Sequence, residues 1–280
     1  MSLVERYDCF LFDLDGVLYR GDLAVPHAGD AVTRLHEAGR PVIFVTNNSS
    51  RTPDQVAEKL MGLGIPASAS EVVTSALATA DLLASRGGGS AFVVGEDGLR
   101  TALASAGIVV ADGEPGRADY VVVGWDRGVD YSKLRTACLL VQRGARLVAT
   151  NADVSFPAPD GLWPGAGAIL SVVTTTTGVT AEVVGKPHAP LFEAALRRAR
   201  GSRPLVIGDR LDTDIAGAAA LGWDSLLVLT GISGERDLAG SRIRPTHVGA
   251  DLTVLFEEPG EAGDRSARDE RPSRGSSPQK

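Results

Sequence analysis

Two aspartates, Asp13 and Asp15, follow an apolar run at residues 7–12 and precede Gly16. The run predicts a buried strand of a parallel sheet, and ligands of such sheets bind beyond the carboxyl ends of the strands. Residues two apart in a strand share a face, and two carboxylates about 4 Å apart repel by roughly 4 kcal/mol at an effective dielectric of about 20. The pair therefore predicts a bound cation or a proton to transfer. A plain Asp-Gly turn is the alternative.

Three further predicted strands also end in polar residues. If these ends share one edge of one sheet, they bring together carboxylates, a hydroxyl, an amide and one cation. Such a set is suited to hold a phosphate beside a divalent metal. The residues are Thr46 and Asn47, Lys186, and Asp209 with Asp214 close behind.

Each of these residues also has an ordinary structural explanation. Thr46 and Asn47 could cap a strand and turn, and Lys186, which precedes a proline, could be a solvated loop lysine. Asp209 could form a turn, and Asp214 could occupy the first turn of a helix, where acids suit the helix dipole. Their common position at strand ends favours the catalytic interpretation.

The order, spacing and strand context of these segments resemble the four motifs of the haloacid dehalogenase superfamily, and the resemblance covers residues 7–256. The insertion between the second and third motifs, with Asn151-Ala152-Asp153, resembles the large α/β cap of one branch. That branch contains the NagD-like nucleotide, 4-nitrophenyl, phosphoglycolate, glycerol-3-phosphate and pyridoxal phosphatases. The matching segments are Asp13-Leu14-Asp15-Gly16-Val17-Leu18-Tyr19, Thr46-Asn47-Asn48, Gly185-Lys186-Pro187 and Gly208-Asp209-Arg210-Leu211-Asp212-Thr213-Asp214.

The resemblance implies a phosphatase that works through an aspartyl-phosphate. Asp13 would be the nucleophile, and Asp15 would protonate the leaving alkoxide and then deprotonate the attacking water. Mg²⁺ would be held by Asp13, the backbone carbonyl of Asp15, and Asp209. The dehalogenases of the superfamily have no aspartate at the position resembling Asp15, so its presence favours phosphate-ester hydrolysis.

The resemblance also implies roles for the other strand-end residues. Thr46, Asn47 and Lys186 would hold the phosphoryl oxygens and supply the electrostatic stabilisation that phosphoryl transfer needs. Asp214 would orient Asp209 or Lys186 rather than bind the metal.

The elements that carry these residues alternate between strand and helix. This alternation predicts an α/β fold with a parallel-sheet core and a second α/β unit inserted in the chain. The resemblance implies that the core is doubly wound (Rossmann-like) and that the inserted unit is a mobile α/β cap domain. We expect the core at residues 1–80 and 181–256, the cap at 81–180, and a disordered tail at 257–280. A short strand at 183–184 is expected to resume the core pattern, and a helix is expected at 211–221. The Pro- and Gly-rich segment 151–167 predicts a long loop.

The bulk composition of the 280-residue chain excludes several classes of protein. A net charge of −7 and the lack of basic clusters argue against nucleic acid as a partner. Since no apolar run approaches the roughly 20 residues of a membrane span, we expect no membrane association. Two cysteines cannot form a disulfide framework, so a cytoplasmic location is expected.

The expected substrate is a small phosphorylated metabolite such as glycerol 3-phosphate, phosphoglycolate or 4-nitrophenyl phosphate. One alternative is a phosphotransferase that uses the same aspartyl-phosphate. The other is a phosphometabolite-binding protein without turnover. Members of the branch often pair through their caps, so a homodimer through the cap is a further expectation.

Overall fold

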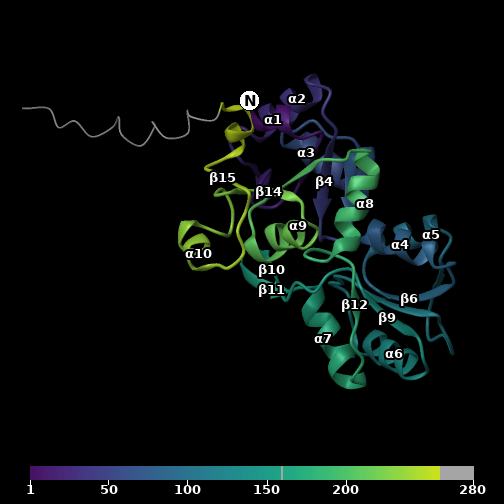
Figure 1. The fold of residues 1–280 in the computed structure, drawn as a ribbon. Coiled ribbons are helices and arrows are strands. Elements are labelled where there is room, and N and C mark those ends of the chain that lie inside the picture. Colours follow the sequence, from purple (N-terminus) through teal and green to yellow (C-terminus); the bar gives the residue numbers. More distant parts are fainter. Residues whose placement is uncertain (159, 259–280) are drawn as a thin grey trace, which may run out of the picture.

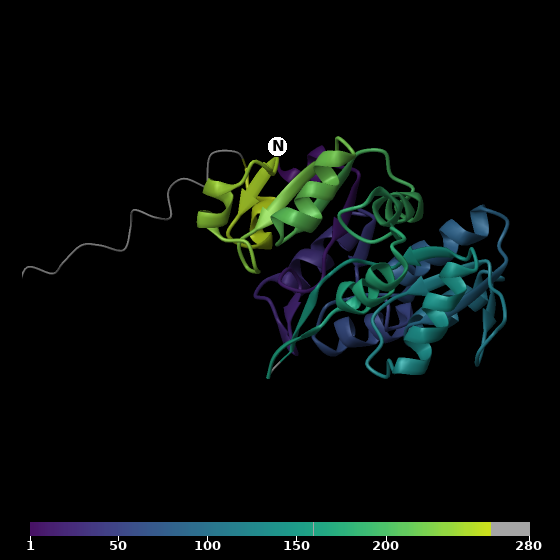
Figure 2. The same cartoon turned by 90° about the horizontal axis from the view of Figure 1, so that it is seen from below.

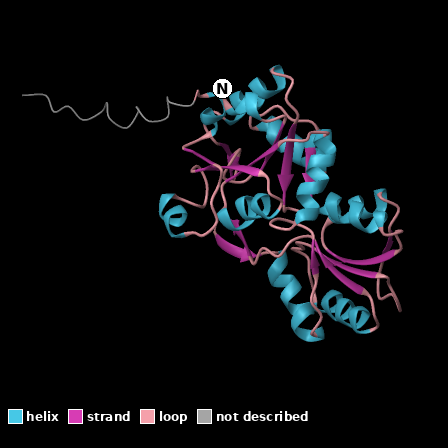
Figure 3. Ribbon diagram, in the orientation of Figure 1, coloured by secondary structure: helices cyan, strands magenta, loops and turns pink. Residues whose placement is uncertain are grey.

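The computed structural model describes residues 1–158 and 160–258, and its strands form two parallel sheets flanked by helices (Figures 1 and 3). The segment drawn in blue to teal, between the purple and the yellow-green parts of the chain, forms the second of two α/β units (Figure 2). The predicted fold, a doubly wound core with an inserted α/β cap, is confirmed. The tail predicted for 257–280 lies, from residue 259 onward, outside the described residues.

The larger sheet has six parallel strands in the order β15-β14-β13-β1-β4-β5. The chain builds one side of β1 first and the other side after the insertion, so the strand order reverses at β1. Parallel sheets have their ligand crevice at the carboxyl ends of strands beside such a reversal. The strands are β1 (Cys9–Phe12), β4 (Val42–Thr46), β5 (Val72–Thr74), β13 (Pro204–Gly208), β14 (Asp224–Val228) and β15 (His247–Gly249).

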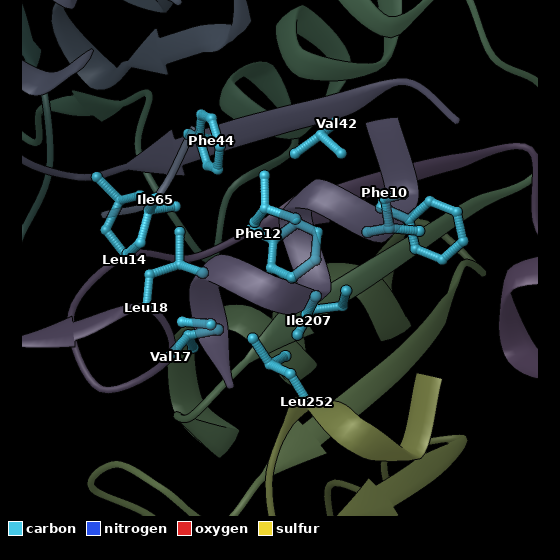
Figure 4. Close-up of a cluster of buried hydrophobic side chains, with 14 of the residues drawn as sticks. Phe10, Phe12, Leu14, Val17, Leu18, Val42, Phe44, Ile65, Ile207 and Leu252 are labelled. Carbon is cyan, nitrogen blue, oxygen red and sulfur yellow. The ribbon is translucent and has the colours of Figure 1, made fainter. Parts of the chain in front are cut away.

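Both faces of β1 are buried, because its four residues are all apolar and alternate between the two faces. Phe10 and Phe12 pack with Phe44 and Ile207 (Figure 4). That face is covered by α1 (Leu3–Arg6), α2 (Ala28–Glu37), α3 (Pro53–Gly62) and η3 (Leu252–Phe256). The opposite face is covered by α4 (Ser75–Ser85), α8 (Ala189–Ala199) and α9 (Ala216–Ala220).

The second sheet has five parallel strands in the order β12-β9-β8-β6-β7. Helices α6 (Tyr131–Gln142) and α7 (Ala166–Thr177) cover one of its faces. Helix α5 (Asp97–Ser105) lies on the other face and packs against α4. The expected boundary at residue 80 therefore falls inside α4, a helix that contacts both units. The strands are β6 (Ser90–Val94), β7 (Val109–Ala111), β8 (Tyr120–Val123), β9 (Arg146–Ala149) and β12 (Glu182–Val183).

The strand before Lys186 corrects one sequence expectation. We expected it to resume the core pattern, but β12 pairs with β9 and is the edge strand of the five-stranded sheet. Two residues provide too little hydrophobic pattern to decide which sheet a strand joins. Lys186 therefore approaches the edge of the core sheet along the chain segment that returns from the second unit.

The expected loop at 151–167 contains a β-hairpin, β10 (Ser155–Ala158) and β11 (Gly161–Pro164). Phe156 lies opposite Trp163, and such cross-strand aromatic pairs stabilise hairpins. Short strands with prolines carry almost no alternation, so the sequence pattern missed them.

The helix expected at 211–221 begins instead with one π-helical turn, η2 (Leu211–Ile215), before α9. The N–H groups of Asp214 and Ile215 both donate to the carbonyl of Arg210, each at 3.2 Å. The carboxylate of Asp214 in turn accepts from the N–H of Arg210 at 3.3 Å. This turn aims Asp214 back at the strand end, and π-turns occur frequently at functional sites.

The remaining short elements lie around the rim of the larger sheet. They are β2 (Tyr19–Arg20), β3 (Leu23–Ala24), η1 (Ala69–Glu71) and α10 (Glu235–Gly240). Within the described part of the chain, no helix combines the length and the apolar character that crossing a membrane requires.

Candidate active site

Asp13 is the first residue after β1, and its N–H still donates to the Ile207 carbonyl of β13 at 2.8 Å. The backbone is therefore held by the sheet while the side chain leaves its edge. The carboxylate forms an ion pair with Lys186. Its side chain is 14% exposed, at the surface of a cavity between the two units.

Lys186 is buried and its ammonium has three partners. Besides Asp13, it donates to Asp214 Oδ1 at 2.8 Å and to the Val45 carbonyl at 3.1 Å. Burial works against the charged ammonium, but the attraction of Asp13 and Asp214 outweighs it and raises the pKa of Lys186. The lysine is therefore a fixed positive charge directly beside Asp13.

Three carboxylates form a compact cluster, since oxygens of Asp13, Asp209 and Asp214 all lie within 4.8 Å of one another. Burial and the charge of Asp214 raise the pKa of Asp209 to about 6. Burial also raises the pKa of Asp13, opposed by Lys186 and reinforced by Asp214 and Asp209. The ionised cluster is thus unfavourable with one lysine as its only buried cation among the described residues.

Asp209 has one oxygen that fits a bound metal. Its Oδ2 accepts from the Ile232 N–H at 2.7 Å, whereas Oδ1 is buried without a partner in the described part of the chain. A buried acceptor without a partner is costly, and an all-oxygen site suits a hard divalent cation. The cluster therefore fits Mg²⁺, and Asp13 and Asp209 are the residues best placed to hold it.

Two glycines make room for Asp209. A Cβ at Gly16 would lie 2.3 Å from Asp209 Oδ2, and one at Gly231 would lie 1.9 Å from the same atom. Gly16 also has a φ of +83°, which disfavours any side chain. Thr230 Oγ1 donates to the Gly16 carbonyl at 2.7 Å and so holds the two segments together.

Asp15 lies outside the acidic cluster and borders the cavity on another side. Asp15 is an exposed residue, yet the surrounding protein raises its pKa by desolvation, opposed by Lys59 and Lys186. Tyr19 Oη lies 3.5 Å from Asp15 Oδ2. A carboxyl group that keeps its proton more readily than usual is suited to general acid catalysis.

Thr46 and Asn47 differ in what their side chains do. Thr46 is buried, and its Oγ1 accepts from the Asn48 N–H at 3.1 Å. The amide of Asn47 accepts from the Lys186 N–H at 2.7 Å and donates to Asp153 Oδ2 at 2.9 Å. Asn47 thus holds Lys186 in place and touches the second unit. A direct contact of its side chain with phosphate stays a prediction.

The structure therefore gathers all seven predicted residues at one edge of the core sheet. The contact between Asp214 and Lys186 is one of the two alternatives expected from the sequence, although the role assigned to Asp214 stays a prediction. Asp15 and Lys186 are set apart: the first is outside the carboxylate cluster, and the second lies behind the wall of the cavity.

The far wall of the cavity was not predicted. Trp125 and Phe156 stack with ring centroids 4.3 Å apart, and Asp153 lies 3.7 Å from the guanidinium of Arg210. Trp125 is the second residue after β8, so the strand-end rule applied to the second sheet would have indicated this segment. Phe156 could not be found in this way, because its hairpin was unrecognised.

Comparisons with known proteins agree with this architecture. A family model described as haloacid dehalogenase-like hydrolase matches residues 10–109, and a HAD-hydrolase-like model matches residues 183–255. The chain is 40% identical to 5'-nucleotidase YutF of Bacillus subtilis over 253 residues, covering 89% of this chain and 98% of that protein. It is 42% identical to acid sugar phosphatase of Staphylococcus aureus over 258 residues, covering 91% and 99%.

A solved structure shows the same likeness. The glycerol phosphate phosphatase Rv1692 from Mycobacterium tuberculosis, in complex with magnesium, superposes with a TM-score of 0.86 at 38% identity. The match covers 91% of this chain and 78% of that one.

Proposed function

This chain belongs to the haloacid dehalogenase-like hydrolases and is a Mg²⁺-dependent phosphatase of small phosphomonoesters, and we propose a catalytic role for each residue of its site. The observation that carries the proposal is the cluster of Asp13, Asp209 and Asp214 around Lys186, at the cavity between the two units.

Asp13 is the nucleophile in this proposal. One carboxylate oxygen forms a bond to phosphorus while the bond from phosphorus to the ester oxygen breaks, which gives an aspartyl-phosphate. Lys186, fixed by Asp13, Asp214 and the Val45 carbonyl, supplies positive charge next to the phosphoryl oxygens. Thr46 keeps its hydroxyl hydrogen for a phosphoryl oxygen, since its oxygen accepts from Asn48.

Asp15 moves the proton. It protonates the leaving alkoxide in the first step, and its raised pKa supports that role. In the second step it takes a proton from water, whose oxygen attacks phosphorus and releases Asp13. Phosphate leaves, and Asp15 has its proton back.

Asp13, Asp209 and the backbone carbonyl of Asp15 would hold Mg²⁺, and Asp214 orients Lys186. When bound, the metal ion neutralises the carboxylates that would otherwise repel the incoming phosphate. The partnerless Oδ1 of Asp209, among the described residues, supports this ligand set.

The finer expectations on domains, partners and location are also proposals. We take residues 1–80 and 181–256 as the core and 81–180 as the cap. Apolar side chains exposed on α6 and α7, among them Leu139 and Val172, support a homodimer through the cap. Two buried free cysteines suit the reducing cytoplasm, and the net charge of −7 disfavours nucleic acid.

The test is release of inorganic phosphate from 4-nitrophenyl phosphate, glycerol 3-phosphate and a 5'-nucleotide, with Mg²⁺ and with EDTA. We expect magnesium-dependent release from at least one ester. A new ester in place of phosphate would identify a phosphotransferase. Binding of the esters without turnover would identify a phosphometabolite-binding protein, and either result would overturn the proposal.

A further inference from the structure

A second cavity adjoins the active site, and Asp15 borders both cavities. If Asp15 protonates the ester oxygen, that oxygen lies at the boundary between them. The phosphoryl group then occupies the first cavity, beside Asp13, and the leaving group extends into the second. Trp125 and Phe156 also border both cavities, so the leaving group meets an apolar wall on the side of the second unit.

Two cations of the core face this second cavity. Arg51 lies five residues beyond the end of β4, and Lys59 lies on α3. Thr52 fixes the start of α3 between them, since its Oγ1 accepts from the Gln55 N–H at 3.3 Å. The Lys59 ammonium lies 3.8 Å from the centroid of the Tyr19 ring. Both cations therefore come from the rigid core unit.

Within the described residues, Arg51 and Lys59 form no ion pair, although Asp15 acts on Lys59 from a longer distance. In the described ranges, 1–158 and 160–258, neither side chain has a carboxylate within 4.0 Å, although the protein has an excess of seven negative charges. Burial and the nearby charge of Arg51 lower the pKa of Lys59, and the charges of Asp15 and Asp22 only partly oppose this. Arg127, on the opposite wall, differs because it donates three hydrogen bonds to Glu96 and is neutralised.

These cations are not explained by the phosphoryl site or by Asp15. The phosphoryl site already has Lys186 and the cluster of three carboxylates that would hold a metal ion. Both cations favour ionised Asp15 from beyond ion-pair distance, whereas a general acid must hold its proton when the ester bond breaks, so an effect on Asp15 alone does not account for them. The two positive charges beside the aromatic wall repel each other, and an anion bound between them would offset this repulsion.

We propose that Arg51 and Lys59 form a subsite for a second anionic group, a carboxylate or a phosphate, on the leaving group of the substrate. The inference rests on the proposed function, because it takes Asp15 as the proton donor to the leaving group. The substrate class is then a small phosphomonoester whose alcohol carries its own negative charge.

Two matched pairs of substrates test the subsite. The first pair is 2-phosphoglycolate and 2-hydroxyethyl phosphate, which differ in the carboxylate. The second pair is 1,3-propanediol bisphosphate and 3-hydroxypropyl phosphate, which differ in the second phosphate. We expect kcat/KM to be at least about tenfold higher for the member that carries the second anionic group, in one pair or in both. For the bisphosphate, this gain is counted beyond the factor of two that comes from having two equivalent phosphates. The pair that shows the preference identifies the group.

Variants connect the preference to the residues. The ratio to follow is kcat/KM for the substrate with the second anionic group divided by kcat/KM for its partner without it. Arg51→Gln and Lys59→Gln should each lower this ratio by about tenfold, whereas the charge-conserving Arg51→Lys and Lys59→Arg should keep most of it. Arg197→Gln, the same change on the exposed part of α8 outside both cavities, should leave the ratio unchanged.

A wild-type ratio near one, or a ratio that Arg51→Gln and Lys59→Gln leave unchanged, overturns the subsite while the phosphatase assignment stands. If none of the four esters is hydrolysed with Mg²⁺ present, the proposed function fails and the subsite falls with it. Thermal unfolding of each variant identifies any that has not folded.

Discussion

Asn47 and Asp153 join the two units at the active site, since Asn47 Nδ2 donates to Asp153 Oδ2 at 2.9 Å. Asn47 follows β4 of the core, and Asp153 precedes the β10–β11 hairpin of the second unit. The same Asn47 side chain accepts from the Lys186 N–H at 2.7 Å. The position of the second unit is thus coupled to the lysine that contacts Asp13.

Asp153→Ala should therefore impair catalysis without touching the reacting groups. We expect kcat/KM to fall about tenfold or more, because Asn47 and Arg210 lose their partner in the second unit. Asp153→Asn keeps an acceptor for Asn47 and should retain more activity. Asp112→Ala, an exposed acid of the same unit, is the control and should leave kcat/KM near the wild-type value. Steady-state kinetics of the three variants decide the point.

Asp13→Asn should abolish turnover and leave the fold intact. The amide is a poor nucleophile, so we expect phosphate release to fall by at least about 10⁴-fold. Lys186 keeps Asp214 and the Val45 carbonyl as partners, and the variant should therefore unfold cooperatively like the wild type. Asp212→Asn makes the same change on an exposed side chain and should keep its activity. Activity near the wild-type value in Asp13→Asn would contradict the assignment of Asp13 as the nucleophile.

Gly16→Ala tests whether Asp209 needs the space beside it. The new Cβ would lie 2.3 Å from Asp209 Oδ2, so we expect Asp209 to shift and activity to fall at least about 100-fold. Gly21→Ala is a matched control: Gly21 also has a positive φ, +59°, but an added Cβ there meets nothing within 4 Å. It should cost stability and little activity. Equal losses of activity in both variants would point to backbone strain alone.

Much of the core site could be predicted because its residues follow a simple rule of position. Asp13, Thr46 and Asp209 directly end or follow buried apolar strands, and the carboxyl ends of such strands share one edge of a parallel sheet. Each of these strands is a continuous apolar run, so both the elements and the edge they share follow from the residues.

The parts that could not be predicted depend on long-range packing. The two residues of β12 carry no pattern that distinguishes one sheet from another. The π-turn that aims Asp214 is set by contacts with Arg210 and Lys186 rather than by helix propensity. Arg51 and Lys59 look like ordinary surface cations in the sequence, and only the folded structure shows that they line one cavity.

Asp8 should contribute stability that is lost in acid. Its carboxylate accepts from the N–H groups of Ser202 and Arg203, at 2.9 and 2.8 Å, and joins the start of β1 to the start of β13. Partial burial opposes ionisation, but these hydrogen bonds prevail and lower the pKa of Asp8 from 3.8 to about 2. The contribution is therefore complete above pH 3.8 and is lost as the pH falls toward 2.

The measurement compares Asp8→Asn with the wild type by urea unfolding at several pH values. At pH 7 we expect the free energy of unfolding of the variant to be lower by about 1 kcal/mol, a value reduced because the carboxylate is partly solvated. The difference should shrink between pH 4 and pH 2. A difference that is constant over this range would rule out the linkage.

Asp209→Asn should raise stability without metal and remove the response to Mg²⁺. Burial and Asp214 raise the pKa of Asp209 from 3.8 to about 6, so the ionised carboxylate is unfavourable in the folded state. For an acid with a raised pKa, this destabilisation is absent below pH 3.8 and complete above pH 6. In EDTA at pH 7.5, the variant should therefore melt at a higher temperature than the wild type, and the gap should shrink as the pH falls toward 4.

With Mg²⁺ present, the wild type should melt at a higher temperature than Asp209→Asn. Ligand at 100 times its Kd stabilises a folded protein by about 2.7 kcal/mol, and about 1 kcal/mol shifts the Tm of a chain of this size by roughly 2–4 °C. The wild type should therefore gain several degrees, while the variant, which has lost a ligand charge, should gain almost none. A wild-type Tm that does not respond to Mg²⁺ would mean that the carboxylates of Asp13 and Asp209 do not hold the metal. The Oδ1 of Asp209, which has no partner in the described part of the chain, would then need another explanation.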